Sequence, residues 1–572
     1  MNIDTVPFVA EPAAPRTGLP KARDMSHHLN SITKRRQANK LKELYKYAAI
    51  PGMIPMAGGI PSPAVFPFET LSADILRYDH LPLNPPRIPK KQGIFEWLFS
   101  SSSPVTDKIS IPKYAPDPTD PMAIQLATSL QYAAATGPPA FPVWLRKYVE
   151  TVFKPAFADW DVLVDVGATD AMTKVCSMML VEGDSVLVEE WTYPGAMNAY
   201  LPYNVNVVGL PMDHEGIIAA DMDKVLAEWD VEKQGPFPRM LYTVPTGQNP
   251  TGATMLADRR REVYEICSKY DIVIVEDEPY YCLFMDEYVP RGAKLSPVAQ
   301  AARDVETSEG GKGNEAFLKS LPPSFLHFDT DGRVIRFDTF SKTSCPGSRL
   351  GWVTSSPIFI DRLTRISESG TQAPSGFATA LTLTMLNHWG WDGYVRWLRG
   401  IKANYRMKRD WMLDALADSF HLESDSNGLN PLVISTPFGR RFTGYARPNP
   451  TSAEGRWDEK RGLTGAHGKP LISYLPPSAG MFVFLGVHLS GHPEYAALGD
   501  DATRILAERL WRVLAKHHVL FAPGWAFDPE GPHNIGGEGM GYFRLSFSIV
   551  TYEETRDAME VFAKVLGKFL TK

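Results

Sequence analysis

Between residues 162 and 363 the chain alternates short, continuously apolar runs with stretches of helical periodicity. An apolar run without regular polar alternation is typical of a strand that is covered on both faces, as in parallel sheets whose strands are joined by helices. The pattern therefore predicts a mainly parallel α/β sheet. The runs that we interpret as its strands are 162–166, 185–189, 240–244, 272–276, 333–339 and 352–354.

The pattern changes after Asp392. A long helical stretch from about Asp392 to Phe420 leads into a region in which strands and helices are mixed without a regular βα alternation. This mixture predicts a separate, smaller α+β unit. Its expected elements are strands at 481–485 and 542–547 and helices at 502–517 and 552–570.

We divide the chain into four parts. The Pro- and Ala-rich residues 1–25 are expected to form a flexible arm, and residues 26–118 to join the small domain and carry an insertion. Residues 119–391 are the expected large domain and 392–572 the small domain. Three stretches rich in Pro, Gly and polar residues interrupt the pattern and are expected to be long irregular loops, namely 81–118, 294–331 and 437–470.

Composition narrows the class of protein. The formal net charge is -6, which gives no reason to expect nucleic acid or an anionic membrane as a partner. The N-terminus lacks a secretory signal, and no apolar run has membrane-spanning length. The four cysteines lack the spacing of disulfide pairs or metal ligands, so we expect a cytoplasmic protein without a metal site.

The segment 339–352 places Lys342 directly behind an apolar strand, with Thr339 and Ser341 before it and Arg349 after it. A lysine in such a place can form a Schiff base with an aldehyde cofactor. The hydroxyls and the planar guanidinium can hold a phosphate dianion. A Ser-Lys pair alone carries no information, so the interpretation depends on the other strand ends.

Two of those strand ends have ordinary interpretations when they are considered alone. Ala168 and Thr169 open a helix after a strand, where backbone N–H groups and the hydroxyl can bind phosphate, but a plain helix cap explains them as well. Tyr193 follows the next strand and could stack on a pyridine ring. Packing of that aromatic ring into the core is the alternative.

Three further segments are more specific. The octet 245–252 puts Asn249 in a rigid loop where its amide can hydrogen-bond a phenolate oxygen, and Tyr280 could reach the same oxygen. Asp277 ends a strand and could pair with a protonated pyridine nitrogen, unless it is part of a common acidic strand-to-loop junction. Arg544 interrupts an apolar strand and must find an anion, either an Asp or Glu or the α-carboxylate of a substrate.

Taken together, these segments resemble the fold-type I pyridoxal 5'-phosphate (PLP)-dependent aminotransferases. The resemblance is closer to the branch that holds kynurenine/2-aminoadipate aminotransferases and fungal aromatic-amino-acid aminotransferases. It runs from about Asp24 to Leu570 and is broken by the three insertions. The motifs that add to it are 26–29 (SHHL), 58–63 (GGIPSP), 130–132 (LQY), 478–482 (SAGMF) and 522–524 (APG).

The resemblance implies a large, mainly parallel α/β/α domain, a smaller α+β domain, bound PLP and a homodimer with shared active sites. Lys342 would carry PLP, Asp277 would pair with the pyridine nitrogen and Tyr193 would stack on the ring, which makes them the expected catalytic residues. The other implied cofactor contacts are Asn249 and Tyr280 at the phenolate oxygen, Ala168, Thr169, Thr339, Ser341 and Arg349 at the phosphate, and Tyr132 at the phosphate of the neighbouring subunit.

For the substrate, the resemblance implies that Arg544 binds the α-carboxylate, with Gly59 and Asn249 close by. Ala168 stands where the family often has serine, so one hydroxyl contact is lost. The implied reaction is ping-pong transamination of Phe, Tyr or Trp with 2-oxoglutarate or another 2-oxo acid. The alternatives are 2-aminoadipate or kynurenine transamination, a PLP-dependent lyase, and a PLP-binding regulator, which would need a winged-helix domain where only a short arm is expected.

Overall fold

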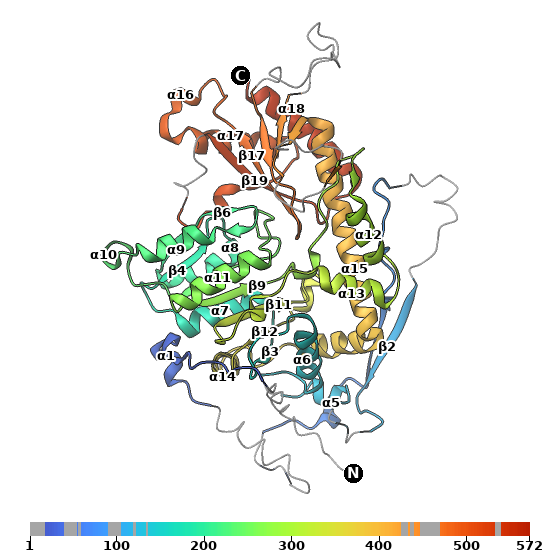
Figure 1. Ribbon diagram of the computed structural model, residues 1–572. Coiled ribbons are helices and arrows are strands. Elements are labelled where there is room, and N and C mark those ends of the chain that lie inside the picture. Colours follow the sequence, from blue (N-terminus) through green and yellow to red (C-terminus); the bar gives the residue numbers. More distant parts are fainter. Residues whose placement is uncertain are drawn as a thin grey trace.

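The computed structural model describes residues 18–38, 54, 56, 59–89, 105–117, 120, 122–132, 135–424, 433–434, 440–446, 469–531 and 539–571 (Figure 1). A seven-stranded sheet lies at its centre, and only β12 (Gly351–Ser355) runs antiparallel to its neighbours. The sheet confirms the predicted mainly parallel α/β class. Its order is β3 (Asp161–Asp165), β12, β11 (Val334–Thr339), β9 (Val273–Asp277), β8 (Met240–Thr243), β4 (Ser185–Glu189) and β5 (Asn206–Leu210).

The apolar runs are continuous because both faces of this sheet are buried. In β9, Val273 and Val275 belong to one apolar cluster, and Ile274 belongs to the cluster on the opposite face. Successive side chains of a strand point to opposite faces, so neither face of these strands needs a regular series of polar residues. Among the helices that contribute to the first cluster are α7 (Ala168–Met179), α8 (Pro194–Tyr200) and α14 (Pro357–Glu368), and among those of the second are α6 (Ala140–Val152), α9 (Ala219–Ala227) and α11 (Ala257–Lys269).

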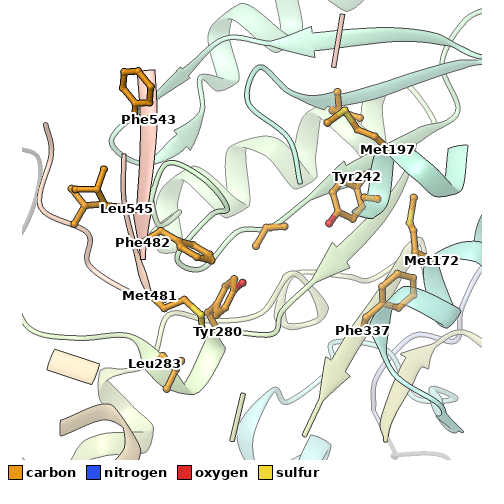
Figure 2. Close-up of a cluster of buried hydrophobic side chains, with 14 of the residues drawn as sticks. Met172, Met197, Tyr242, Tyr280, Leu283, Phe337, Met481, Phe482, Phe543 and Leu545 are labelled. Atoms are coloured by element: carbon orange, nitrogen blue, oxygen red, sulfur yellow. The ribbon is translucent and has the colours of Figure 1, made fainter. Parts of the chain in front are cut away.

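A second, wholly antiparallel sheet forms the C-terminal unit. Its inner side chains join the first apolar cluster, in which Phe482 lies beside Tyr280 of the large sheet's loops (Figure 2). The strand order is β13 (His421–Ser424), β15 (Phe442–Tyr445), β16 (Ile472–Tyr474), β17 (Phe482–His488), β19 (Met540–Ser546) and β18 (Ala522–Pro523), with helices α17 (Ala502–Lys516) and α18 (Tyr552–Phe569) against it.

The long helix α15 connects the two units and is longer than the sequence pattern predicts. It extends over Gly376–Ser419, whereas we expected it to begin near Asp392. The difference has a local cause, because Gly390 has φ 65° and ψ 179° and kinks the helix. A positive φ costs glycine little, so the chain bends there and helical structure continues on both sides.

The expectation of an irregular loop at 294–331 is wrong. This stretch contains α12 (Pro297–Glu306) and α13 (Gly311–Ser320), which lie along α15 (Figure 1). Ion pairs fix them there, with Glu306 2.6 Å from Lys402 and Glu309 2.7 Å from Arg396. Of the other two insertions, 90–104 and 447–468 lie outside the described residues, and β2 (Thr106–Pro112) pairs with β1 (Thr70–Leu76).

The described part of the expected flexible arm is held against the large unit. The Ala158 N–H donates to Pro20 O over 2.7 Å, and Arg23 lies 3.0 Å from Asp331. Further on, His27 and His28 lie 2.6 and 3.2 Å from the two carboxylate oxygens of Asp271. Residues 18–28 are therefore anchored at several points.

The His27, His28 and Asp271 side chains also converge as metal ligands would, and no other such group occurs among the described residues. The two imidazole distances are ordinary hydrogen-bond lengths, and the Arg333 guanidinium already lies 3.5 Å from Asp271 Oδ1. The positive charge of Arg333 beside the Asp271 carboxylate disfavours the binding of a metal cation there. We therefore interpret the cluster as an anchor of the arm.

We expect this anchor to weaken in acid. Burial lowers the pKa of His28 to about 4, an effect that Asp271 only partly offsets. The unfolded histidine has a pKa near ~6.5, so the folded state binds fewer protons between these values. The free energy of unfolding should therefore fall as the pH drops from about 6.5 towards about 4, by on the order of 1–3 kcal/mol in total.

The predicted weakening of the anchor can be measured by hydrogen–deuterium exchange of residues 26–36 at pH 7 and pH 5, corrected for intrinsic rates. The segment should lose protection at pH 5 in the wild type and in His27→Gln, because the imidazole that this variant removes is exposed. His28→Gln should show no such pH dependence. Equal loss of protection in all three proteins would contradict the assignment to His28.

Candidate active site

A cavity of about 340 Å³ lies at the carboxyl ends of the parallel strands, where the large sheet meets the C-terminal unit. Parallel strands bring their carboxyl ends to one edge, which explains why residues distant in sequence converge there. All the predicted site residues line this cavity except Tyr132 and Gly59. The predicted residues that line the cavity are Ala168, Thr169, Tyr193, Asn249, Asp277, Tyr280, Thr339, Ser341, Lys342, Arg349 and Arg544.

Tyr132 and Gly59 lie elsewhere in this single chain. Tyr132 is 59% exposed and lines a different cavity of about 680 Å³, together with Phe68 and Phe377. Gly59 is exposed, and no heavy atom lies within 4 Å of the position that a Cβ would take. Neither residue touches the cavity that holds Lys342.

Asp277 ends β9 and is the buried acid of the cavity. The Tyr242 hydroxyl donates a 2.8 Å hydrogen bond to Asp277 Oδ2, whereas the buried Oδ1 has no partner among the residues that the structure describes. Burial raises the pKa of Asp277 to about 6, and the Tyr242 bond opposes that rise. A buried carboxylate oxygen without a partner is costly. Asp277 is therefore suited to a ligand that brings a proton donor.

Lys342 follows β11 and lies among charged side chains. Burial lowers its pKa, the positive charges of Arg544 and Arg349 lower it further, and Asp277 acts in the opposite direction. A lowered pKa leaves more of the amine neutral near neutral pH. A neutral amine is the nucleophile and the base that this position would need.

Hydroxyls, a guanidinium and a helix start meet at one end of the cavity. Thr339 Oγ1 donates to Ser341 Oγ over 2.9 Å and accepts from the Ser341 N–H over 3.2 Å. Helix α7 begins after Gly167 without a side-chain cap. A Cβ on Gly167 would lie 2.8 Å from Arg349 Nη2 and would displace this guanidinium, and the φ of 118° at this position also favours glycine. The donors and the helix dipole together form an anion site.

Arg544 of β19 faces the same cavity from the C-terminal unit. Its guanidinium lies over the rings of Phe482 and Phe527, 4.1 and 4.8 Å from their centroids, and donates to Asn249 Oδ1 over 2.7 Å. Within the described part of the chain, no ion pair joins it to a carboxylate, and its buried Nε has no partner. The alternative of a structural Asp or Glu partner is therefore not observed there.

The bond from Arg544 also orients Asn249. Because Asn249 Oδ1 accepts the guanidinium N–H, the Nδ2 amide is left to donate. Tyr280, whose pKa burial raises, keeps its hydroxyl proton and is a second donor beside it. The cavity thus offers two neutral donors to an anionic oxygen.

A buried cluster of charges fixes the strands beneath the cavity, and the sequence analysis missed it. Arg336 pairs with Asp338 over 2.8 Å and with Glu276 over 3.0 Å, and Arg260 pairs with Glu278 over 2.9 Å. Each of these side chains is buried. The signal in the sequence is a set of charged residues inside apolar strands, which must pair with one another when buried.

This arrangement fits PLP. Asp277 has a buried free oxygen for a pyridine nitrogen, Asn249 and Tyr280 have donors for a phenolate oxygen, and the start of α7 with Arg349 forms an anion site. Tyr193 lies at the cavity beside Gly195, where a Cβ would be 2.5 Å from the Tyr193 ring, so the glycine lets this ring keep its place.

The fold and the cavity define a PLP-dependent enzyme of fold type I, and comparison with known proteins identifies its family. The family model "Aminotransferase class I and II" matches residues 128–428. The chain belongs to this family, and its cofactor is PLP. Among the described residues, no helix has both the length and the apolar character to cross a membrane.

Several relatives cover nearly the whole chain. The aromatic amino acid aminotransferase C56E4.03 of Schizosaccharomyces pombe is 31% identical over 95% of this chain and 98% of its own. The L-tyrosine:2-oxoglutarate aminotransferase atrD of Tapinella panuoides is 30% identical over 99% of both chains. The crystal structure of aminotransferase Aro8 from Candida albicans is 31% identical, with a TM-score of 0.76 and coverage of 97% and 100%.

Proposed function

We propose that this aminotransferase acts on aromatic L-amino acids (Phe, Tyr and Trp) and uses 2-oxoglutarate or a similar 2-oxo acid as acceptor. The observation that carries the proposal is the Arg544 guanidinium, which has no carboxylate partner among the described residues and lines one cavity with Lys342 and Asp277. A guanidinium in this position suits the α-carboxylate that every amino acid and 2-oxo acid carries. The activities for which the relatives with near-complete coverage are named support the aromatic class.

The cofactor-binding residues would take the following roles. Bound to Lys342, PLP supplies an electron-accepting pyridine ring. Asp277 holds the ring nitrogen through Oδ1, and Tyr193 covers one face of the ring. Asn249 and Tyr280 donate to the ring oxygen. The phosphate is bound by Thr339, Ser341, Thr169, Arg349 and the backbone at Ala168.

Two side chains would act on the substrate. Arg544 binds its α-carboxylate and so sets the orientation of the α-carbon towards Lys342. The Lys342 amine takes the α-proton at Nζ and later returns it, which its lowered pKa favours. Because donor and acceptor use the same residues in turn, the kinetics should be ping-pong.

We also propose a homodimer with shared active sites. The support is the place of Tyr132, which is 59% exposed in one chain and lies beside the exposed aromatic Phe68 in a wide cavity. In a dimer its hydroxyl would reach the phosphate in the neighbouring subunit, and Gly59 would lie close to substrate. A cytoplasmic location is supported by four free cysteines, three of them buried.

An absorbance spectrum of the purified holoenzyme tests the function. Phenylalanine added without any acceptor should convert the band of Lys342-bound PLP to that of pyridoxamine 5'-phosphate. A 2-oxo acid added afterwards should restore the first band. Alanine serves as the control amino acid, because it has the same carboxylate but no aromatic side chain, and it should react far more slowly.

Other outcomes separate the alternatives. If phenylalanine leaves the band unchanged and 2-aminoadipate or kynurenine converts it, the substrate class is wrong and the aminotransferase assignment stands. If an amino acid is consumed while no pyridoxamine 5'-phosphate forms, the protein is a PLP-dependent lyase.

A further inference from the structure

We propose that Tyr242 is a positioning residue, which fixes the Asp277 carboxylate so that Oδ1 alone is presented to the ring nitrogen of bound PLP. The inference rests on the role proposed above for Asp277. Tyr242 does not line the cavity, and the sequence analysis treated it as one residue of an apolar strand. Only its contact in the folded chain distinguishes it.

The placement of Tyr242 follows from the pairing of two parallel strands. Tyr242 of β8 is in register with Val275 of β9, two residues before Asp277. Both side chains point to the same face of the sheet, because alternate residues share a face. The ring is fully buried in an apolar cluster that includes Met172 and Met197 (Figure 2). The hydroxyl therefore has a fixed direction.

The direction of the hydrogen bond is also fixed. Burial raises the pKa of Tyr242 well above its ordinary value, so the phenol keeps its proton. An ionised carboxylate can only accept, so Tyr242 Oη donates to Asp277 Oδ2 over 2.8 Å. This bond satisfies one oxygen and leaves Oδ1 buried and, in the described part of the chain, without a partner. The unsatisfied oxygen is the one that can receive a ring N–H.

Removal of the hydroxyl should act on the cofactor through Asp277. Without it, both carboxylate oxygens would be buried without a donor, and the ionised form of Asp277 would be less stable. The carboxylate would also be free to rotate. Both changes weaken the bond to the ring nitrogen, and neither affects the phosphate site formed by α7 and Arg349.

The test compares two variants with two cofactors. Tyr242→Phe removes the hydroxyl, and the matched control is Tyr200→Phe. Tyr200 is fully buried in the same apolar cluster, and its hydroxyl has no hydrogen-bond partner among the described residues. The cofactors are PLP and its 1-deaza analogue, in which C–H replaces the ring nitrogen. Dissociation constants are measured by absorbance on the full-length protein.

We expect Tyr242→Phe to weaken PLP binding roughly tenfold, the size of one hydrogen bond to a charged group. It should also move the pH midpoint of the bound PLP band. The dissociation constant of the 1-deaza analogue should change by no more than about twofold, because this cofactor has no ring N–H that could bond to Asp277. Tyr200→Phe should leave the dissociation constants of both cofactors unchanged. Equal losses with both cofactors, or no loss with either, would overturn the proposal.

Failure of the proposed function would look different. In that case the wild-type protein would not form the covalent band with either aldehyde. If Tyr242→Phe does not fold, site-specific 3,5-difluorotyrosine at position 242 replaces it, because this residue keeps the ring and changes only the acidity of the donor. The pH midpoint should then shift with PLP alone, and an unchanged midpoint would overturn the proposal.

Discussion

Lys342→Ala should abolish turnover while the protein still binds PLP non-covalently. The variant loses both the covalent link and the base that removes the α-proton, and we expect activity to fall by roughly 10³-fold or more. Binding should survive because Asp277, Arg349 and the start of α7 remain in place. Borohydride reduction followed by peptide mass spectrometry should find the cofactor on Lys342 in the wild type only.

Lys147→Ala is the matched control, since Lys147 is exposed on α6 and lies outside the cavity. It should keep the covalent band and full activity. A small added amine should restore part of the lost activity of Lys342→Ala, because it can take the proton from the substrate in place of the lysine. Near-normal turnover of Lys342→Ala without added amine would refute the assignment of this residue.

Arg544→Ala should have the second largest effect. A buried charge-assisted bond to a carboxylate is worth about 2–4 kcal/mol, so kcat/KM should fall by roughly 10²-fold for the amino acid and for the 2-oxo acid alike. Arg544→Lys should give an intermediate loss, because a point charge replaces the planar fork. Rapid-mixing measurements of each half-reaction at varied substrate concentration give these values.

Binding of PLP should change much less than kcat/KM in Arg544→Ala. Arg512→Ala, which removes an exposed guanidinium from α17 of the same unit, is the control and should behave as wild type. An unchanged kcat/KM for both substrates in Arg544→Ala would exclude it as the carboxylate site. Arg544 would then serve only to hold Asn249.

The sequence predicts which residues meet in this cavity because they follow strand ends. Asn249, Asp277 and Lys342 come directly after apolar runs, and parallel topology brings such positions to one edge. Tyr242 carries no such signal, because a tyrosine inside an apolar strand is indistinguishable from ordinary core. Its partner is set by the register of β8 on β9, which the amino-acid pattern does not specify.

Helix boundaries and insertions were harder to predict. The start of α15 at Gly376 was missed because Gly390 interrupts the helical pattern. The helices α12 and α13 were missed because polar and charged side chains join them to α15, such as Glu306 to Lys402 and Asn314 to Arg399. Charges that pair only across tertiary structure look like solvent-exposed loop in a single sequence.

The apolar cluster that runs through both sheets has a consequence for folding. It contains Val275 of β9 and Leu485 of β17, so the large sheet and the C-terminal unit share one interior. Conditions that release the C-terminal unit would also uncover the strands that carry Asp277 and Lys342. The boundary predicted at 391/392 falls inside α15, between the two sheets, and we expect the sheets to unfold together. A chain cut there would lose the packing beneath Lys342 as well as Arg544.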